Sequence, residues 1–280
     1  MNTATNIKEN QTLNQMLFPV EKVKMEDLTG IPANSDYEFA VLGEIEGKKR
    51  LLNACSERYE LIPNTEIFPQ IREILFEGGL EFSEKYRMTS NYARFYADYV
   101  IESKQASIGT DLDIVKPLIR VRHSYNGMTK YAIIFGYYRL VCDNGLVVPV
   151  KSKEAQNLHI VGRHTISIKK SFDLLIERLE QFTLNHKLYS EVYENLAKKE
   201  VVNVENRVKE VLNACSIPEK KSENLIEIVN AEAAKLYNGK INDWLIYNGV
   251  NQLIHKGDNK KVLEQKEVYD FKAIDFLINH

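Results

Sequence analysis

The chain has 280 residues, of which 44% are hydrophobic and 27% are charged, and its formal net charge is −2. This composition is typical of a soluble globular protein with one large domain or two small ones. No apolar run approaches the roughly 20 residues that cross a bilayer, and the polar start lacks the pattern of a signal peptide. Cys55, Cys142 and Cys215 are widely spaced and odd in number, which argues against a disulfide framework and favours a cytoplasmic location.

Residues 1–36 are predicted to form a partly ordered lead-in, because their apolar residues show only weak periodicity. An α+β domain is then expected over residues 37–170. Its first patterns predict a hairpin of Tyr37–Glu44 and Arg50–Cys55 around Gly47, and then a strand at Tyr59–Ile62. A helix is predicted to begin at an Asn64 cap, to run to Phe76 and to stop at Gly78-Gly79. Paired strands are predicted at Leu80–Met88 and Ala93–Ser103.

Two tight reversals follow in the same domain. Asn126-Gly127, between Val115–Tyr125 and Thr129–Phe135, is the strongest hairpin signal in the sequence, because both turn residues tolerate a positive φ. The remaining strand predictions are Tyr137–Val141 and Leu146–Val150, which flank a turn at Asp143-Asn144-Gly145, and a short strand at Ile166–Ile168.

Residues 171–280 are predicted to be helical and to pack on the sheet or to oligomerise. Apolar residues from Phe172 to Leu196 recur at spacings of three and four, which predicts one helix of about seven turns. Trp244 is expected to be a packing anchor. Further helices are predicted near residues 201–214, 220–237, 241–255 and 268–278. The fold class is therefore α+β, a mostly antiparallel sheet with one early helix, followed by a helical C-terminal region.

Sequence motifs for catalysis or cofactor binding are absent. The chain has no GxxxxGK[ST], GxGxxG, HExxH or CxxC pattern, so no cofactor, metal or catalytic residue is assigned and the protein is not expected to be an enzyme. Cys142 shares its region with three histidines, but their spacing fits no known ligand pattern. Asp111 and Asp113 are expected to serve turn formation or solvation, and a metal-dependent nuclease is kept as a third hypothesis.

Positive charge is concentrated between Lys116 and Lys170. This stretch holds ten Lys and Arg against two acids, a net charge of +8, and it is also rich in tyrosine. A sheet face that combines cations with aromatic rings can contact phosphates and stack on bases, at roughly 1–3 kcal/mol per stacked base. A sheet that is merely solvated, or that faces a protein partner, is the competing interpretation. The candidate nucleic-acid contacts are Arg94, Arg120, Arg122, Tyr125, Lys130, Tyr137, Tyr138, Arg139, Arg163 and Lys169.

Several segments together resemble one family. They are Ser56–Asn64 (SERYELIPN), His123–Gly127 (HSYNG), Tyr138–Leu146 (YRLVCDNGL) and Asn242–Val250 (NDWLIYNGV). The family is the phage/plasmid-like group catalogued as domain of unknown function 932, in which Asp is common at position 126 and Ala at position 249. The resemblance implies an origin in a mobile element but no established activity, so it assigns no catalytic residue.

We therefore expect an accessory protein of phage or plasmid origin that binds nucleic acid, preferably single-stranded DNA, in replication or recombination. The alternative is a protein-interaction module that modulates a host defence or replication factor. Homo-oligomerisation and a host protein partner remain open, and no membrane association is expected. Binding to nucleic acid should weaken steeply with salt, because released counterions drive it.

Overall fold

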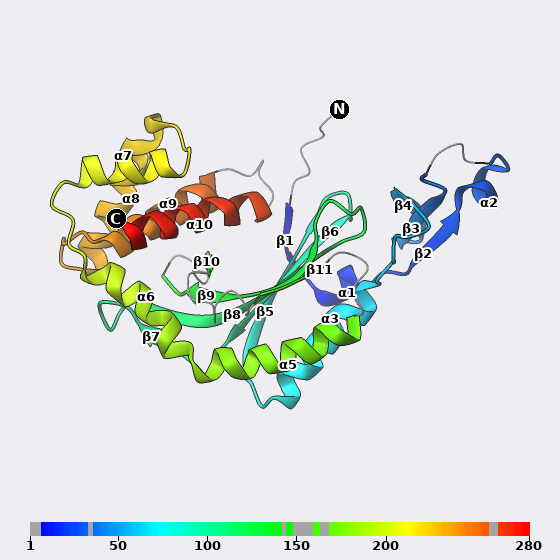
Figure 1. The fold of residues 1–280 in the computed structure, drawn as a ribbon, viewed down its shortest axis with the longest axis horizontal. Helices are drawn as coiled ribbons and strands as arrows, with labels where there is room; N and C mark the ends of the chain where they lie inside the picture. Colours follow the sequence, from blue (N-terminus) through cyan, green and yellow to red (C-terminus); the bar gives the residue numbers. More distant parts are fainter. Residues whose placement is uncertain (1–6, 33–35, 142–143, 148–158, 163–167, 258–262) are drawn as a thin grey trace. The chain divides into compact units, whose positions relative to one another are not determined.

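The computed structural model describes residues 7–32, 36–141, 144–147, 159–162, 168–257 and 263–280 (Figure 1). Its fold is α+β, as the sequence predicts. Two compact units alternate along the chain. Unit 1 consists of Met1–Ser103, Ile119–Ile134 and His159–Glu180, and unit 2 consists of Lys104–Leu118, Phe135–Leu158 and Gln181–His280. The boundaries predicted at residues 36 and 170 follow sequence order, whereas these units interleave.

The N-terminal segment belongs to two sheets of unit 1. β1 (Ile7–Gln11) pairs antiparallel with β5 (Phe82–Thr89), and β2 (Val20–Lys24) pairs antiparallel with β3 (Phe39–Ile45). The short helices α1 (Leu13–Met16) and α2 (Met25–Thr29) follow these two strands. Pairing with distant strands holds this segment in place, and the weak local periodicity of the sequence contains no sign of such pairing.

The smaller sheet has the order β2-β3-β4, and its strands carry these labels in Figure 1. β3 and β4 (Lys48–Cys55) form the predicted hairpin. Its two turn residues, Glu46 and Gly47, have φ values of 53° and 72°. Two positive φ values in succession are the signature of a type I′ turn, whose twist matches that of the flanking strands.

The larger sheet has the order β1-β5-β6-β8-β9-β10, with β7 paired to β8 and β11 paired to β9. Both predicted pairs, β5 with β6 and β8 with β9, are confirmed, whereas Tyr59–Ile62 is not a strand. Asn144 and Gly145, predicted as turn residues, are strand residues opposite Arg139 and Tyr138. The remaining strands are β6 (Arg94–Ile101), β7 (Ala106–Ser107), β8 (Ile114–Ser124), β9 (Tyr131–Arg139), β10 (Asn144–Val147) and β11 (Ile160–Gly162).

Helix α3 (Asn64–Glu77) packs on the larger sheet in unit 1. Phe68 contacts the ring of Tyr86 edge-on, with the ring centroids 6.4 Å apart. The capping residue is Pro63, because Asn64 is already helical and its side chain donates instead to the Met16 carbonyl at 2.9 Å. As predicted, the helix ends at Gly78-Gly79, where Gly79 has a φ of 69°.

The predicted long helix over 172–196 is two helices, α5 (Ile168–Leu184) and α6 (His186–Lys198), separated by Asn185. Its apolar stripe is buried, which confirms that it packs within the protein. In unit 2, Phe182 lies 5.3 Å from Phe135 and Tyr193 lies 5.0 Å from Trp244, between ring centroids. Trp244 is fully buried, as expected of a packing anchor.

The C-terminal helices of unit 2 pack against one another in pairs: α7 on α8, α8 on α9, and α10 on both α9 and α7. Ile168, predicted as a strand residue, begins α5, and residues 166–167 lie outside the described chain. Within the described residues, no helix combines the length and the apolarity that a membrane crossing requires. The helices are α7 (Val204–Ala214), the 3-10 helix η1 (Glu219–Lys221), α8 (Ser222–Leu236), α9 (Asp243–Gly257) and α10 (Leu263–Asn279).

Candidate functional site

The structure buries most of the basic and aromatic face that the sequence predicted to be exposed. Among the candidate contacts, Lys130 is exposed and Arg122 is half-buried. Arg163 lies outside the described residues, as does the side chain of Lys169. The buried candidates are Arg94, Arg120, Tyr125, Tyr137, Tyr138 and Arg139. The expectation that these six side chains are accessible to bases and phosphates is therefore wrong for this conformation.

Arg120 is neutralised inside unit 1. Its Nε and Nη2 atoms donate to the two carboxylate oxygens of Asp98 at 2.7 and 2.9 Å, and Arg87 donates to the same carboxylate at 2.6 Å. Burial alone would raise the pKa of Asp98, but Arg120 and Arg87 hold it well below its ordinary value. These cations stabilise a buried carboxylate and are not presented to a ligand.

Arg139 is neutralised inside unit 2. Its guanidinium donates to both oxygens of Asp113 at 2.7 and 2.6 Å and to Glu232 at 2.6 Å. The same Asp113 carboxylate accepts from the Tyr237 hydroxyl and the Trp244 indole, both at 2.9 Å. Turn formation or solvation was expected for Asp113. Solvation is wrong, whereas the Asp113 backbone N–H does donate to the Thr110 carbonyl at 3.2 Å within a turn. Asp113 lies in the predicted loop, but it is fully buried at the centre of a four-donor network.

Burial of both sheet faces is the physical reason for these differences. Every residue of β6 and of β9 is buried. A strand covered on both faces loses the alternation that would separate core from surface. Charged side chains on such strands must then be paired, because an isolated buried charge is very unfavourable.

Within the described residues, no three His, Cys, Asp or Glu side chains converge as a metal site would require. His123 is buried, and its Nε2 lies 2.9 Å from the Ile62 carbonyl oxygen. Cys142 and His164 lie outside the described residues.

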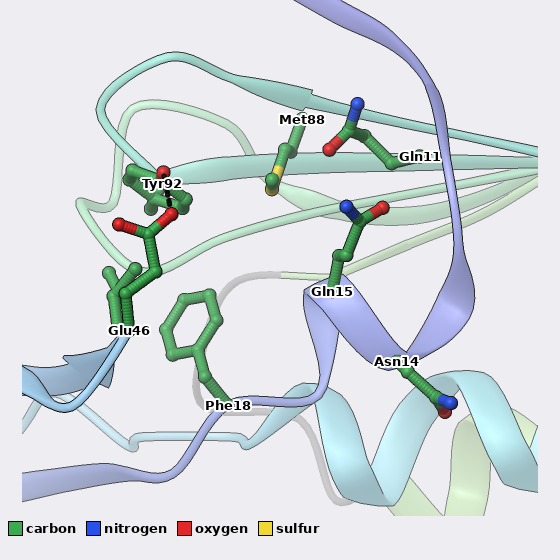
Figure 2. A pocket seen from close by; sticks show the side chains of 8 residues that line it. Gln11, Asn14, Gln15, Phe18, Glu46, Met88 and Tyr92 are labelled. Atoms are coloured by element: carbon green, nitrogen blue, oxygen red, sulfur yellow. Dashed lines mark hydrogen bonds between the residues drawn. The ribbon is translucent and has the colours of Figure 1, made fainter.

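A pocket of about 230 Å³ in unit 1 is the site at which side chains of mixed chemistry converge (Figure 2). Phe18 and Met88 supply apolar surface to it, and Tyr92 and Glu46 lie together on one side in the figure. On the other side Gln15 points toward Gln11, whereas Asn14 points away from both. The pocket is lined by Gln11, Asn14, Gln15, Phe18, Ile45, Glu46, Met88 and Tyr92.

Two strained backbone positions place side chains in this pocket. Glu46 and Tyr92 have φ values of 53° and 58°, and they are two of four described residues other than glycine with a positive φ. They come from separate turns, yet the Tyr92 hydroxyl donates to the Glu46 carboxylate at 3.4 Å. Strained residues that persist in a fold cluster at functional sites. Their convergence therefore marks the pocket as a candidate site.

Phe18 is held in place by a glycine and by other rings. A Cβ on Gly43 would lie 2.9 Å from Phe18 Cε2, so only glycine lets the ring approach β3 this closely. The ring also packs against Phe95 and Tyr125, each with centroids 5.9 Å away. Tyr125, predicted to stack on a base, instead packs against Phe18, a ring that lines the pocket.

Positive charge flanks the pocket on β4. Lys48, Lys49 and Arg50 are consecutive and exposed. The Arg50 guanidinium lies 5.2 Å from the centroid of the Tyr92 ring and 3.9 Å from the Glu46 carboxylate. Sequence reasoning missed this cluster, because three cations at a hairpin do not stand out beside the larger block at Lys116–Lys170. The available signal was Glu46 directly before the glycine of the predicted hairpin, a turn position where Asn, Asp or Gly is usual.

A second polar cluster, also missed, joins α9 to α10 in unit 2. His255 Nε2 and Asn251 Nδ2 each lie 2.8 Å from the fully buried carboxylate of Asp270. Lys266 donates to the His255 carbonyl at 3.1 Å. These bonds satisfy a buried acid between two packed helices.

Comparison with known proteins gives one result. The family described as Domain of unknown function (DUF932) matches residues 51–274, which is most of the chain. No curated protein and no solved structure matches it. The matched range confirms the resemblance seen in the sequence motifs. It contains Met88 and Tyr92 of the pocket, whereas the other six lining residues and the cations Lys48, Lys49 and Arg50 precede it. The chain belongs to the domain of unknown function 932 family.

Proposed function

We propose that this protein binds single-stranded nucleic acid and that the pocket of unit 1 receives an unpaired base. The observation that carries the proposal is an aromatic and thioether pocket with amide side chains beside three consecutive exposed cations. Nonspecific single-strand binding in proteins combines a cationic track for the backbone with aromatic rings for the bases. Duplex DNA keeps its bases stacked, so it cannot fill such a pocket without extruding one.

The size and the charge of the site support this class of ligand. At about 230 Å³ the pocket is smaller than the ~300–1,000 Å³ of typical drug-sized sites, which suits a single planar ring. Lys49 pairs with Glu21 at 2.7 Å, but both side chains are largely exposed, so that pair is weak and can be exchanged for a phosphate contact. Lys48 and Arg50 alternate with Lys49 along β4, so they share the other face of the strand. A role in the replication or recombination of a mobile element would follow from such binding.

Fluorescence anisotropy with labelled single-stranded and duplex oligonucleotides tests the proposal. We expect single strands to bind more tightly than duplex at about 50 mM salt and to weaken toward about 200 mM. Replacing Lys48 and Arg50 together by glutamine should flatten the slope of log affinity against log salt by about 1.4, since each phosphate contact on a single strand contributes about 0.7.

The matched control is the double replacement Lys235→Gln and Lys240→Gln, which removes two exposed cations from unit 2. It should leave both affinity and slope unchanged. Absence of binding at low salt, or an equal loss of slope in the two double variants, would refute the assignment to this edge of unit 1.

A further inference from the structure

We infer that the pocket selects guanine, and that Glu46 is the residue that recognises it. This inference rests on the proposed function, because it requires a nucleic-acid ligand. It is carried by the position of Glu46, by the hydrogen-bonding capacity of its carboxylate, and by the amide on the other side of the pocket.

Glu46 occupies a backbone position that its residue type disfavours. The first residue of a type I′ turn is usually Asn, Asp or Gly, because these tolerate a positive φ. The Glu46 side chain nevertheless lines the pocket from this position, with φ at 53°. Asparagine would form the turn with less strain, so the turn alone does not account for a glutamate there.

A carboxylate can only accept hydrogen bonds, and the contacts of Glu46 leave it capacity to do so. The bond from Tyr92 to Oε1 is long, at 3.4 Å, and Arg50 lies 3.9 Å from Oε2. Each oxygen has two lone pairs, so both can accept from a ligand. Arg50 is next to Glu46, and Lys48 shares its face of β4, so positive charge on this face disfavours a cationic ligand. The complement of Glu46 is therefore a neutral group with N–H donors.

Among the bases, guanine alone presents two neighbouring donors, N1–H and the N2 amino group, which match the two oxygens of one carboxylate. Adenine and cytosine place an acceptor nitrogen next to their amino group, and thymine places a carbonyl on either side of its single N–H. In each of those bases an acceptor would face a carboxylate oxygen, and the repulsion would oppose binding.

The other side of the pocket fits the acceptor edge of the same base. Gln15 Oε1 already accepts from the backbone N–H of Thr12 at 2.7 Å and from its hydroxyl at 3.2 Å. The Gln15 amide therefore offers its NH₂ group as a donor. Figure 2 shows Gln15 on the side away from Glu46 and Tyr92. Guanine carries acceptors at O6 and N7, and Phe18 supplies a ring on which the base can stack.

The test compares short oligo-dT strands with a single central guanine, inosine or adenine. Inosine keeps N1–H and O6 but lacks the N2 amino group. We expect the guanine strand to bind about tenfold more tightly than the adenine or all-thymine strand, the size of one good bidentate contact. The inosine strand should lose most of that advantage.

Variants of the full chain assign the preference to Glu46. Glu46→Gln and Glu46→Asn should abolish the guanine preference and keep binding to oligo-dT, and Glu46→Asn should also raise the melting temperature because it suits the turn. Glu44→Gln is the matched control, since Glu44 is an exposed acid two residues away on β3, and it should keep the preference.

The outcomes separate this inference from the proposed function. If every strand binds equally, the guanine assignment is overturned while single-strand binding stands. If the guanine preference survives in both Glu46 variants, the role of Glu46 is overturned. If no strand binds even at low salt, the proposed function itself fails, and the inference fails with it.

Discussion

Replacing Asp113 with asparagine should destabilise unit 2 by about 2–4 kcal/mol. An amide oxygen at the Oδ2 position would keep the bonds from Tyr237, Trp244 and one Arg139 nitrogen. The NH₂ group would then face Arg139 Nε, which donates to Oδ1 at 2.7 Å in the native protein. One charge-assisted hydrogen bond is lost, and one buried donor is left opposed to another donor. Arg139 keeps its ion pair with Glu232 at 2.6 Å, which limits the loss.

Arg139→Met should cost more, about 3–5 kcal/mol, because it leaves two buried carboxylates without their shared cation. Urea unfolding followed by tryptophan fluorescence measures the stability of unit 2 in both variants. Trp244 is the single tryptophan of the chain, and its indole donates to Asp113 within unit 2. The emission therefore reports the unfolding of the unit that contains the network.

Asp111→Asn is the matched control, because Asp111 is exposed two residues away and makes the same change in charge. It should shift stability by less than about 0.5 kcal/mol, as surface substitutions usually do. The account of this network is wrong if Asp113→Asn behaves like Asp111→Asn, or if it destabilises more than Arg139→Met.

Three further predictions concern the rest of the molecule. The pKa of Asp98 is held low by its arginine partners, so its contribution to stability is present above about pH 4 and is lost as the pH falls further; Asp98→Asn should flatten this acid dependence in urea titrations. Gly43→Ala should displace Phe18, lower the unfolding free energy by about 1–3 kcal/mol, and weaken single-strand binding in the anisotropy assay. Gly249→Ala should destabilise by a similar amount in thermal unfolding despite better helix propensity, because its Cβ would lie 2.8 Å from Val229 Cγ2.

The elements predicted well are those whose signal is local. A turn such as that at Gly47 and a helix stop such as Gly78-Gly79 depend on the φ angles that glycine allows, and these act within a few residues. At Asn126-Gly127 only Gly127 has a positive φ, although the hairpin forms. The hairpin of β3 with β4 and the pairs β5 with β6 and β8 with β9 follow from such signals. The break at Asn185 was missed, because an apolar stripe continues through it at helical spacing.

The parts that could not be predicted depend on contacts between distant residues. β1 is held by β5, and the Arg139 partner Glu232 lies 93 positions away. The pocket draws on α1, the β3–β4 turn and the β5–β6 turn, and no periodicity within one segment brings these together. What the sequence did contain was a glutamate in a turn position suited to asparagine, a local inconsistency of the kind expected at functional sites.

The charge of the Lys116–Lys170 block illustrates how a window along the chain can mislead. The acids that neutralise Arg120 and Arg139 are Asp98, Asp113 and Glu232, and all three lie outside the window. Part of the net charge of +8 therefore arises because the window counts these arginines and omits their acidic partners. Sheet pairing and helix packing join residues that are far apart in sequence, so such partners fall outside the window. The short run Lys48–Arg50 is exposed because a two-residue turn projects its neighbours into solvent, yet Lys49 also pairs with a distant acid, Glu21. A charge count along the chain therefore becomes informative only once the partners of each cation are known.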